Sequence, residues 1–168
     1  GTPSIVVGVF AWTWIVARQK HFSGFAGGVA LAVLMIPMVM RTTEEMIKLV
    51  PHSLREAALA LGYPRWRTSV GVVVRTCLPG IVTGALLAVA RVAGETAPLI
   101  FTALGSQYLS TNLRQPLAAL PLAVYTYATG PYEDWHRLAW ATALVLILVV
   151  FVLSVLARLA TRRRFNAR

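Results

Sequence analysis

Long apolar runs without charge constrain this chain most strongly. Residues 138–157 form 20 consecutive uncharged positions, and residues 22–40 form another 19. A run of about 20 apolar residues is long enough for a helix to cross the hydrocarbon core of a bilayer. Because lipid offers no partner to backbone N–H and C=O groups, such a run must be helical. The sequence therefore predicts an all-α, polytopic membrane protein.

Two further stretches complete a set of four predicted spans. Residues 1–17 carry no charge and reach the lower length limit for a span. Residues 76–98 are long enough but include Arg91 and Glu95. Together with 22–40 and 138–157, these segments put both ends of the chain on one side of the membrane.

A fifth apolar stretch, residues 115–132, contains three prolines and several polar side chains. Proline interrupts a helix because it lacks an N–H donor and clashes with the preceding turn. We therefore interpret this stretch as a short helix within an outer loop at 99–137, and not as a span.

The charge balance predicts the orientation. The chain is 57% hydrophobic and 13% charged, yet it carries 16 Lys and Arg against 6 Asp and Glu, a formal charge of +10. Basic residues concentrate in cytoplasmic loops of membrane proteins. With four spans, four basic residues lie on one side and Arg91 lies within the membrane. The other eleven share the side of both termini, which we predict to be cytoplasmic: Arg41, Lys48, Arg55, Arg65, Arg67, Arg75, Arg158, Arg162, Arg163, Arg164 and Arg168.

Several function classes are disfavoured by what the sequence lacks. Basic residues split between two membrane flanks do not form the single basic face that nucleic-acid binding needs. The single cysteine, Cys77, excludes an internal disulfide and a multi-cysteine metal site. No P-loop is present, because Lys20 and Lys48, the only lysines, follow Gln19 and Ile47 instead of glycine. We therefore expect no catalytic residue, metal or cofactor, and ATP hydrolysis, if used, in another subunit.

The predicted cytoplasmic loop, residues 41–75, contains signals for short helices. Thr42–Glu45 and Ser53–Glu56 both fit the capping-box pattern that starts a helix. We predict a helix over 54–61, ended by Gly62, and a further helix with Pro64 in its first turn.

One face of the predicted 54–61 helix is apolar. Leu54, Ala57, Ala58 and Leu61 recur at the spacing of a single helix face. Such a face either lies on the chain's own membrane domain or on lipid headgroups, or it inserts into a groove of a partner protein.

The motif Glu56-Ala57-Ala58, followed after three residues by Gly62, resembles the EAA loop of ABC importer permeases. The resemblance implies a type I importer permease helical bundle whose loop helix docks on a cytoplasmic ATPase dimer. Glu56, Ala57, Ala58 and Gly62 are then the coupling residues. The family's Leu-Pro pair falls four residues late here, at Leu78-Pro79.

Two charges lie inside the third predicted span. Arg91 and Glu95 are four residues apart, which places both on one helix face. A charge at the centre of a membrane helix costs about 2.5–3.5 kcal/mol, so the two groups are expected to pair or to face water. One interpretation is a structural bridge that orients the helix. The other is an ion-pair switch in the transport path: Arg91 is paired with Glu95 at rest and binds a passing oxyanion instead, while Thr96 adds a hydroxyl donor.

The stretch Arg91–Pro98 resembles the A-type permease subunit of the phosphate ABC importer, as do Pro3–Gly8, Arg41–Glu45 and Glu133–Trp135. The resemblance implies a subunit that translocates inorganic phosphate across the cytoplasmic membrane. Its implied partners are a C-type permease, the ATPase dimer and an extracytoplasmic phosphate-binding protein. Such permeases have about six spans, so the first two are expected to be lacking here. The alternatives are a permease for another oxyanion and a non-transporting membrane scaffold.

Small residues recur every four positions in two of the predicted spans. One set is Gly80, Gly84 and Ala88, and the other is Gly24, Gly28 and Ala32. Small residues on one stripe let membrane helices approach closely. We expect both stripes to serve packing.

Overall fold

The computed structural model describes residues 3–108 and 110–165, with side chains up to residue 159. Residues 1 and 2 of the first predicted span lie outside it. So do the side chains of Arg162, Arg163 and Arg164, and all of Arg168. Every regular element in the described part is a helix, which confirms the predicted fold class.

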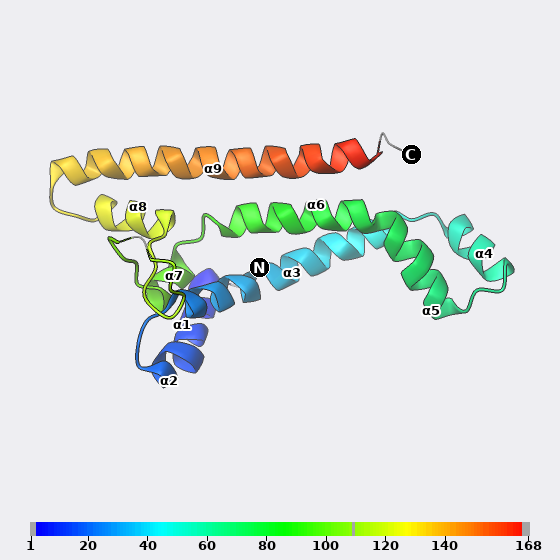
Figure 1. The fold of residues 1–168 in the computed structure, drawn as a ribbon, viewed down its shortest axis with the longest axis horizontal. Helices are drawn as coiled ribbons and strands as arrows, with labels where there is room; N and C mark the ends of the chain where they lie inside the picture. Colours follow the sequence, from blue (N-terminus) through cyan, green and yellow to red (C-terminus); the bar gives the residue numbers. More distant parts are fainter. Residues whose placement is uncertain (1–2, 109, 166–168) are drawn as a thin grey trace. The chain divides into compact units, whose positions relative to one another are not determined.

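Most helices follow one another with connections of a few residues, and a longer irregular connection lies between Thr102 and Leu120 (Figure 1). The first helical stretch comprises α1, a π-helical turn η1 and α2. A second π-helical stretch, η2, lies between α5 and α6. In chain order the elements are α1 (Ser4–Ala11), η1 (Trp12–Val16), α2 (Ala17–Gln19), α3 (Gly24–Lys48), α4 (His52–Ala60), α5 (Arg65–Arg67), η2 (Thr68–Val74), α6 (Arg75–Val92), α7 (Ala97–Thr102), α8 (Leu120–Ala128) and α9 (Glu133–Phe165).

Three of the described helical stretches are long and apolar enough to cross a membrane: Gly24–Lys48, Arg65–Val92 and Glu133–Leu159. The stretch Ser4–Gln19 is apolar but shorter. Within 115–132 the only described helix is α8, with 9 residues. Sidedness of the loops and the four-span topology stay predictions.

Several of the predicted helix boundaries are wrong. The Thr42–Glu45 signal does not start a helix, because α3 runs on to Lys48. The Thr42 hydroxyl donates back to the carbonyls of Met38 and Val39, as a threonine inside a helix does, and does not cap a helix end. Ion pairs spaced three and four residues apart then support the extension, among them Arg41–Glu45 with a 3.0 Å separation of Nε and Oε1.

Ser53–Glu56 does not form the predicted capping box either, although a helix is present at this position. α4 begins at His52, directly after Pro51, so Ser53 already lies inside the helix and makes no cap hydrogen bond. Pro64 stands just before α5 instead of in its first turn. The third long helix begins at Arg65, eleven residues before the predicted start of the span, because α5, η2 and α6 are continuous.

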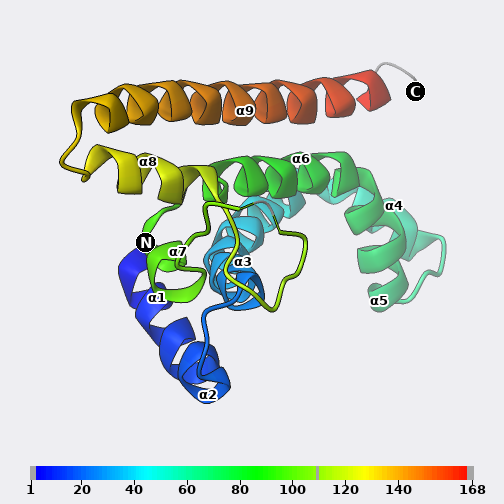
Figure 2. The ribbon, with the colours of Figure 1, turned by 60° about the vertical axis from the view of Figure 1, so that its left-hand side comes forward.

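The chain divides into two compact units, whose boundaries fall within α3, α6 and α9. The first unit contains the residues up to Ile36 and Val89–Val152. In it α1 packs on α7, side by side in Figures 1 and 2. Gly8 permits this approach, because a Cβ there would lie 2.8 Å from Pro98 Cα. A core of Leu99, Ala103 and Leu122 joins α7 to α8.

The start of α3 is fully capped within the first unit. The Ser23 hydroxyl accepts a hydrogen bond from the Ala26 N–H at 3.2 Å. The Gly24 and Phe25 N–H groups donate to the carbonyls of Gln115 and Leu113. Unpaired N–H groups at a helix start need such partners, so residues 113–115 are held against the start of α3 by backbone bonds.

The second unit contains Pro37–Ala88 and α9 from Leu153. In it α6 packs directly on α3 through glycines. A Cβ at Gly80 would lie 2.4 Å from Met46 Sδ, and one at Gly84 would lie 2.7 Å from Thr42 Oγ1. Gly80 and Gly84 therefore serve the packing predicted for their stripe, whereas Gly28 of the other stripe has open space around it.

Candidate coupling and translocation sites

The C-terminal end of α4 is built around Gly62. Its φ of +82° lies in the left-handed region that glycine enters without strain. The Gly62 N–H donates to Leu59 O at 2.9 Å and the Tyr63 N–H donates to Ala58 O at 3.2 Å. These two bonds form a Schellman motif, so the predicted role of Gly62 as the residue that ends the helix is confirmed.

The apolar face predicted for α4 is divided. Ala58 is buried, with 6% of its surface exposed, whereas Leu54 is 41% and Leu61 78% exposed. Ala57 and Glu56 are exposed as well. Within the described residues, α4 thus turns one alanine inward and leaves the other apolar side chains of that face uncovered.

The attachment of α4 to the rest of its unit rests on few contacts. Val50, just before the helix, joins Val73 and Cys77 in a small buried core. The Arg55 guanidinium donates from Nη2 to Ile47 O in the last turn of α3, at 3.0 Å. The sequence analysis counted Arg55 only as a basic loop residue, because a side chain bonded to a carbonyl eight positions away leaves no local pattern.

The predicted Arg91–Glu95 pair is absent from the structure, and the expectation of one shared helix face is wrong. α6 ends at Val92, and the Gly94 and Glu95 N–H groups close a tight turn onto Arg91 O and Val92 O. No ion pair joins the two charges among the described side chains. Pro98 favours this break, because it has no N–H to donate to Gly94 O and disfavours helical geometry at the residue before it. Gly94 lowers the helix propensity further. Proline alone does not end the helix here, since α3 and α6 continue through Pro37 and Pro79.

The break places three polar side chains on one short segment. Arg91 is exposed in the last turn of α6, and Glu95 and Thr96 are half-buried between α6 and α7. Thr96 precedes the first residue of α7, and its hydroxyl makes no cap hydrogen bond. The segment between α6 and α7 thus carries a guanidinium and a hydroxyl as hydrogen-bond donors, with the Glu95 carboxylate beside them.

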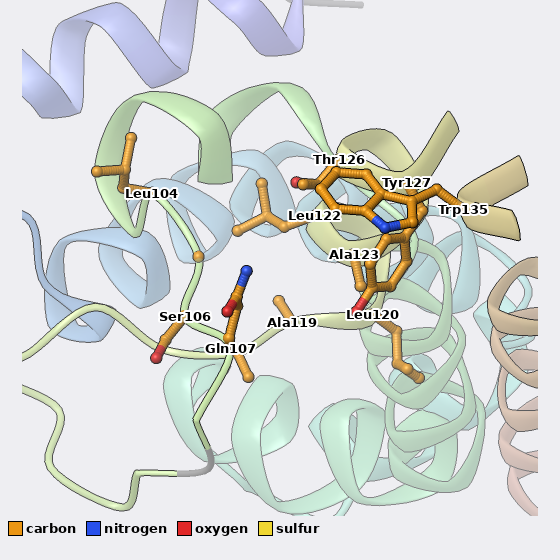
Figure 3. Close-up of a pocket in the computed structure, with 12 residues that line it drawn as sticks. Leu104, Ser106, Gln107, Ala119, Leu120, Leu122, Ala123, Thr126, Tyr127 and Trp135 are labelled. Atoms are coloured by element: carbon orange, nitrogen blue, oxygen red, sulfur yellow. The ribbon is translucent and has the colours of Figure 1, made fainter. Parts of the chain in front are cut away.

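A cavity in the first unit was not anticipated from the sequence. Its volume is about 460 Å³, and Tyr127 of α8 and Trp135 of α9 line it. Figure 3 shows these rings on one side and Leu104 and Gln107 on the other. The Tyr127 and Trp135 rings meet edge to face at 5.8 Å. No local sequence pattern signals this cavity, because its walls come from segments as far apart as Leu104 and Trp135.

A family comparison covers almost the entire chain. Residues 1–166 match the family described as the binding-protein-dependent transport system inner membrane component. The chain belongs to this family. With three long apolar helices in its described part, it is a multi-pass inner-membrane protein and a transport component.

The curated relatives carry a consistent name. Proteins called phosphate transport system permease protein PstA are 54% identical over 156 residues in Yersinia pestis, 51% over 157 residues in Haemophilus influenzae and 41% over 169 residues in Mycobacterium leprae. These matches cover 93%, 94% and 97% of this chain but 53%, 56% and 56% of the relatives. The chain therefore spans about half the length of the curated relatives it matches. No solved structure matches it.

Proposed function

We propose that this chain is the membrane-spanning part of a permease subunit in an ATP-driven importer of inorganic phosphate. The observation that carries the proposal is α4, an EAA-type helix whose apolar side chains are left uncovered in its unit. The names of the relatives supply the substrate, because each of the three is called a phosphate transport permease.

The proposed partners follow from this role. A cytoplasmic ATPase dimer would take α4, and an extracytoplasmic phosphate-binding protein would deliver the substrate, as the family description implies. A C-type permease subunit would complete the membrane domain. The proposed orientation places the 41–75 loop and the C-terminus in the cytoplasm, where basic residues concentrate.

The docking role of α4 is tested with a charge at its exposed face. Burying a leucine side chain contributes about 1.5–3 kcal/mol, so Leu61→Asp is expected to weaken binding of the ATPase by at least tenfold. Ala57→Asp should act in the same direction. Ala58 is unsuitable for this test, since it is buried and a charge there would disturb the fold.

The measurement is copurification of the ATPase with the full-length permease. Leu113→Asp is the matched control, because Leu113 is also exposed but lies in the proposed outer loop. Binding that is as strong in Leu61→Asp as in Leu113→Asp would contradict the docking role and favour a non-transporting scaffold.

The proposed translocation path includes Arg91, Glu95 and Thr96. In this proposal Arg91 acts as an available guanidinium for the passing anion, and Thr96 supplies a hydroxyl donor. Phosphate uptake by vesicles that contain the complete transporter should fall at least tenfold in Arg91→Gln and less in Thr96→Val. Normal uptake by both Arg91→Gln and Glu95→Gln would remove these residues from the path.

A permease for another oxyanion is the remaining alternative. Uptake of labelled phosphate in the presence of a hundredfold excess of sulfate or molybdate separates the two. Phosphate uptake should persist under these conditions. Its loss would indicate that the competing anion is the substrate of this permease.

A further inference from the structure

We propose that Arg55 is the positioning residue that transmits movement of α4 to the membrane helices. This inference rests on the proposed function, in which α4 receives the motion of the ATPase. It concerns the contacts behind α4 and not the surface that docks. The Arg55 side chain is directed toward α3, and Nη2 bonds to Ile47 O at 3.0 Å.

The Arg55 contact joins a cation to a helix C-terminus. Ile47 is the penultimate residue of α3, where the helix dipole is negative, and its carbonyl oxygen also accepts the Val50 N–H at 3.3 Å. A carbonyl oxygen has two lone pairs, so a guanidinium placed there uses the second one and complements the negative end of the helix. Its hydrogen bond also bypasses the connection at 49–51, so α3 and α4 are joined by a side chain as well as by the backbone.

Few other contacts compete with this one. Ala58 is the buried side chain of α4, and a methyl group gives a smooth contact that permits sliding. Leu54, Leu59 and Leu61 are all partly or largely exposed, so none of them anchors α4 in a buried core. α4 also packs on η2, but within the described residues the bond from Arg55 is the side-chain hydrogen bond that joins α4 to α3, and its direction restrains the rotation of α4.

Two unsatisfied polar atoms mark the same interface. Arg55 Nε and Thr68 Oγ1 are both buried without a hydrogen-bond partner. Thr68 is the first residue of η2, which packs on α4 and continues into α6. Buried polar atoms are nearly always paired. Because Arg55 Nε is a donor, Thr68 Oγ1 can accept, and α4 and η2 are packed, a second arrangement in which the two atoms bond would satisfy both. In that arrangement, Arg55 would connect α4 to α6 as well as to α3.

The test uses the complete transporter in vesicles and compares Arg55→Met with Arg65→Met. Both changes remove one positive charge from the loop, but Arg65 is exposed, with no described bond to α3. Arg55→Met should retain the ATPase and lower the phosphate moved per ATP hydrolysed at least fivefold. Arg65→Met should change this ratio less than twofold. Arg55→Lys, which keeps a donor for Ile47 O, should recover at least half of the loss.

A distance measurement separates this proposal from the proposed function. Spin labels at Met40 on α3 and Ser53 on α4 report the α3–α4 geometry, with Cys77→Ala and no other cysteine in the background. Arg55→Met should broaden the distance distribution, whereas Arg65→Met should leave it narrow. If the unmodified transporter moved no phosphate, the proposed function would fail while the distances still decided the role of Arg55.

Thr68→Val provides the second variant. If Arg55 and Thr68 act through one bond, the double variant should lose no more coupling than Arg55→Met alone. Arg55→Met that kept both the narrow distribution and a coupling ratio within twofold of the unmodified protein would overturn the proposal. So would loss of ATPase binding at an unchanged distance, because Arg55 would then belong to the docking surface.

Discussion

Gly84→Ala is expected to separate α3 from α6. The new Cβ would lie 2.7 Å from Thr42 Oγ1 and 2.9 Å from Thr42 Cβ, compared with about 3.5–4.0 Å for an ordinary contact. Thr42 cannot turn aside easily, because its side chain is β-branched and its hydroxyl bonds to two carbonyls of its own helix. The helices must therefore move apart.

The magnitude follows from two opposed terms. Overpacking typically costs about 1–3 kcal/mol, and the upper value of about 3 kcal/mol applies here, because 2.7 Å is closer than real Cβ contacts come and Thr42 cannot yield. Replacing glycine by alanine inside a helix returns about 1 kcal/mol. The net loss is about 2 kcal/mol, which corresponds to a roughly 30-fold larger population of the opened state.

Cys77 reports this opening. It is 7% exposed and packs with Val50 and Val73 near the α3–α6 contact. When reclosing is fast, the rate at which a buried thiol is alkylated is proportional to the population of the open state. Alkylation of Cys77 in the full-length permease, followed by mass spectrometry, should be about 30-fold faster in Gly84→Ala. Gly71→Ala is the control, since a Cβ there meets nothing within 4 Å. Equal rates in the two variants would refute the reasoning.

Three further substitutions test the roles of other glycines. Gly80→Ala should accelerate Cys77 alkylation less than Gly84→Ala does, because the clashing atom belongs to the flexible end of Met46. Gly62→Ala should cost about 1–2 kcal/mol at the left-handed end of α4 and weaken copurification of the ATPase; unchanged binding would contradict this. Gly8→Ala should lower the Tm of the purified protein by overpacking α1 against α7 at a cost of about 1–3 kcal/mol, and an unchanged Tm would disprove it.

Features with a local cause were predicted well. The long apolar runs identified the helices of the membrane domain, since hydropathy over about 20 residues is a property of the run itself. The break at 49–51 and the end of α4 at Gly62 also followed from neighbouring residues, proline in one case and glycine in the other. The coupling residues Glu56, Ala57, Ala58 and Gly62 were assigned through their resemblance to the EAA loop and remain a proposal as a docking site.

Features that depend on competition between local signals were predicted poorly. Thr42–Glu45 fits both a capping box and the interior of a helix, and ion pairs along α3 favoured the interior. The spacing of Arg91 and Glu95 fits an ion pair on one helix face. In the structure α6 ends at Val92, and the turn that follows takes Glu95 off the helix that carries Arg91. In both cases the local sequence is compatible with two conformations, and the predicted one differs from the one in the structure.

By itself, the sequence determined the class of the protein: an all-helical membrane protein whose loop resembles the EAA loop and whose third long apolar run carries two charges. These features depend on residue type and spacing within one segment. Only the tertiary structure decided that Ala58 turns inward while Leu61 stays exposed, that Gly84 meets Thr42, and that Arg55 bonds to Ile47. Those contacts join different elements of the fold, and no local periodicity specifies which side chains meet there.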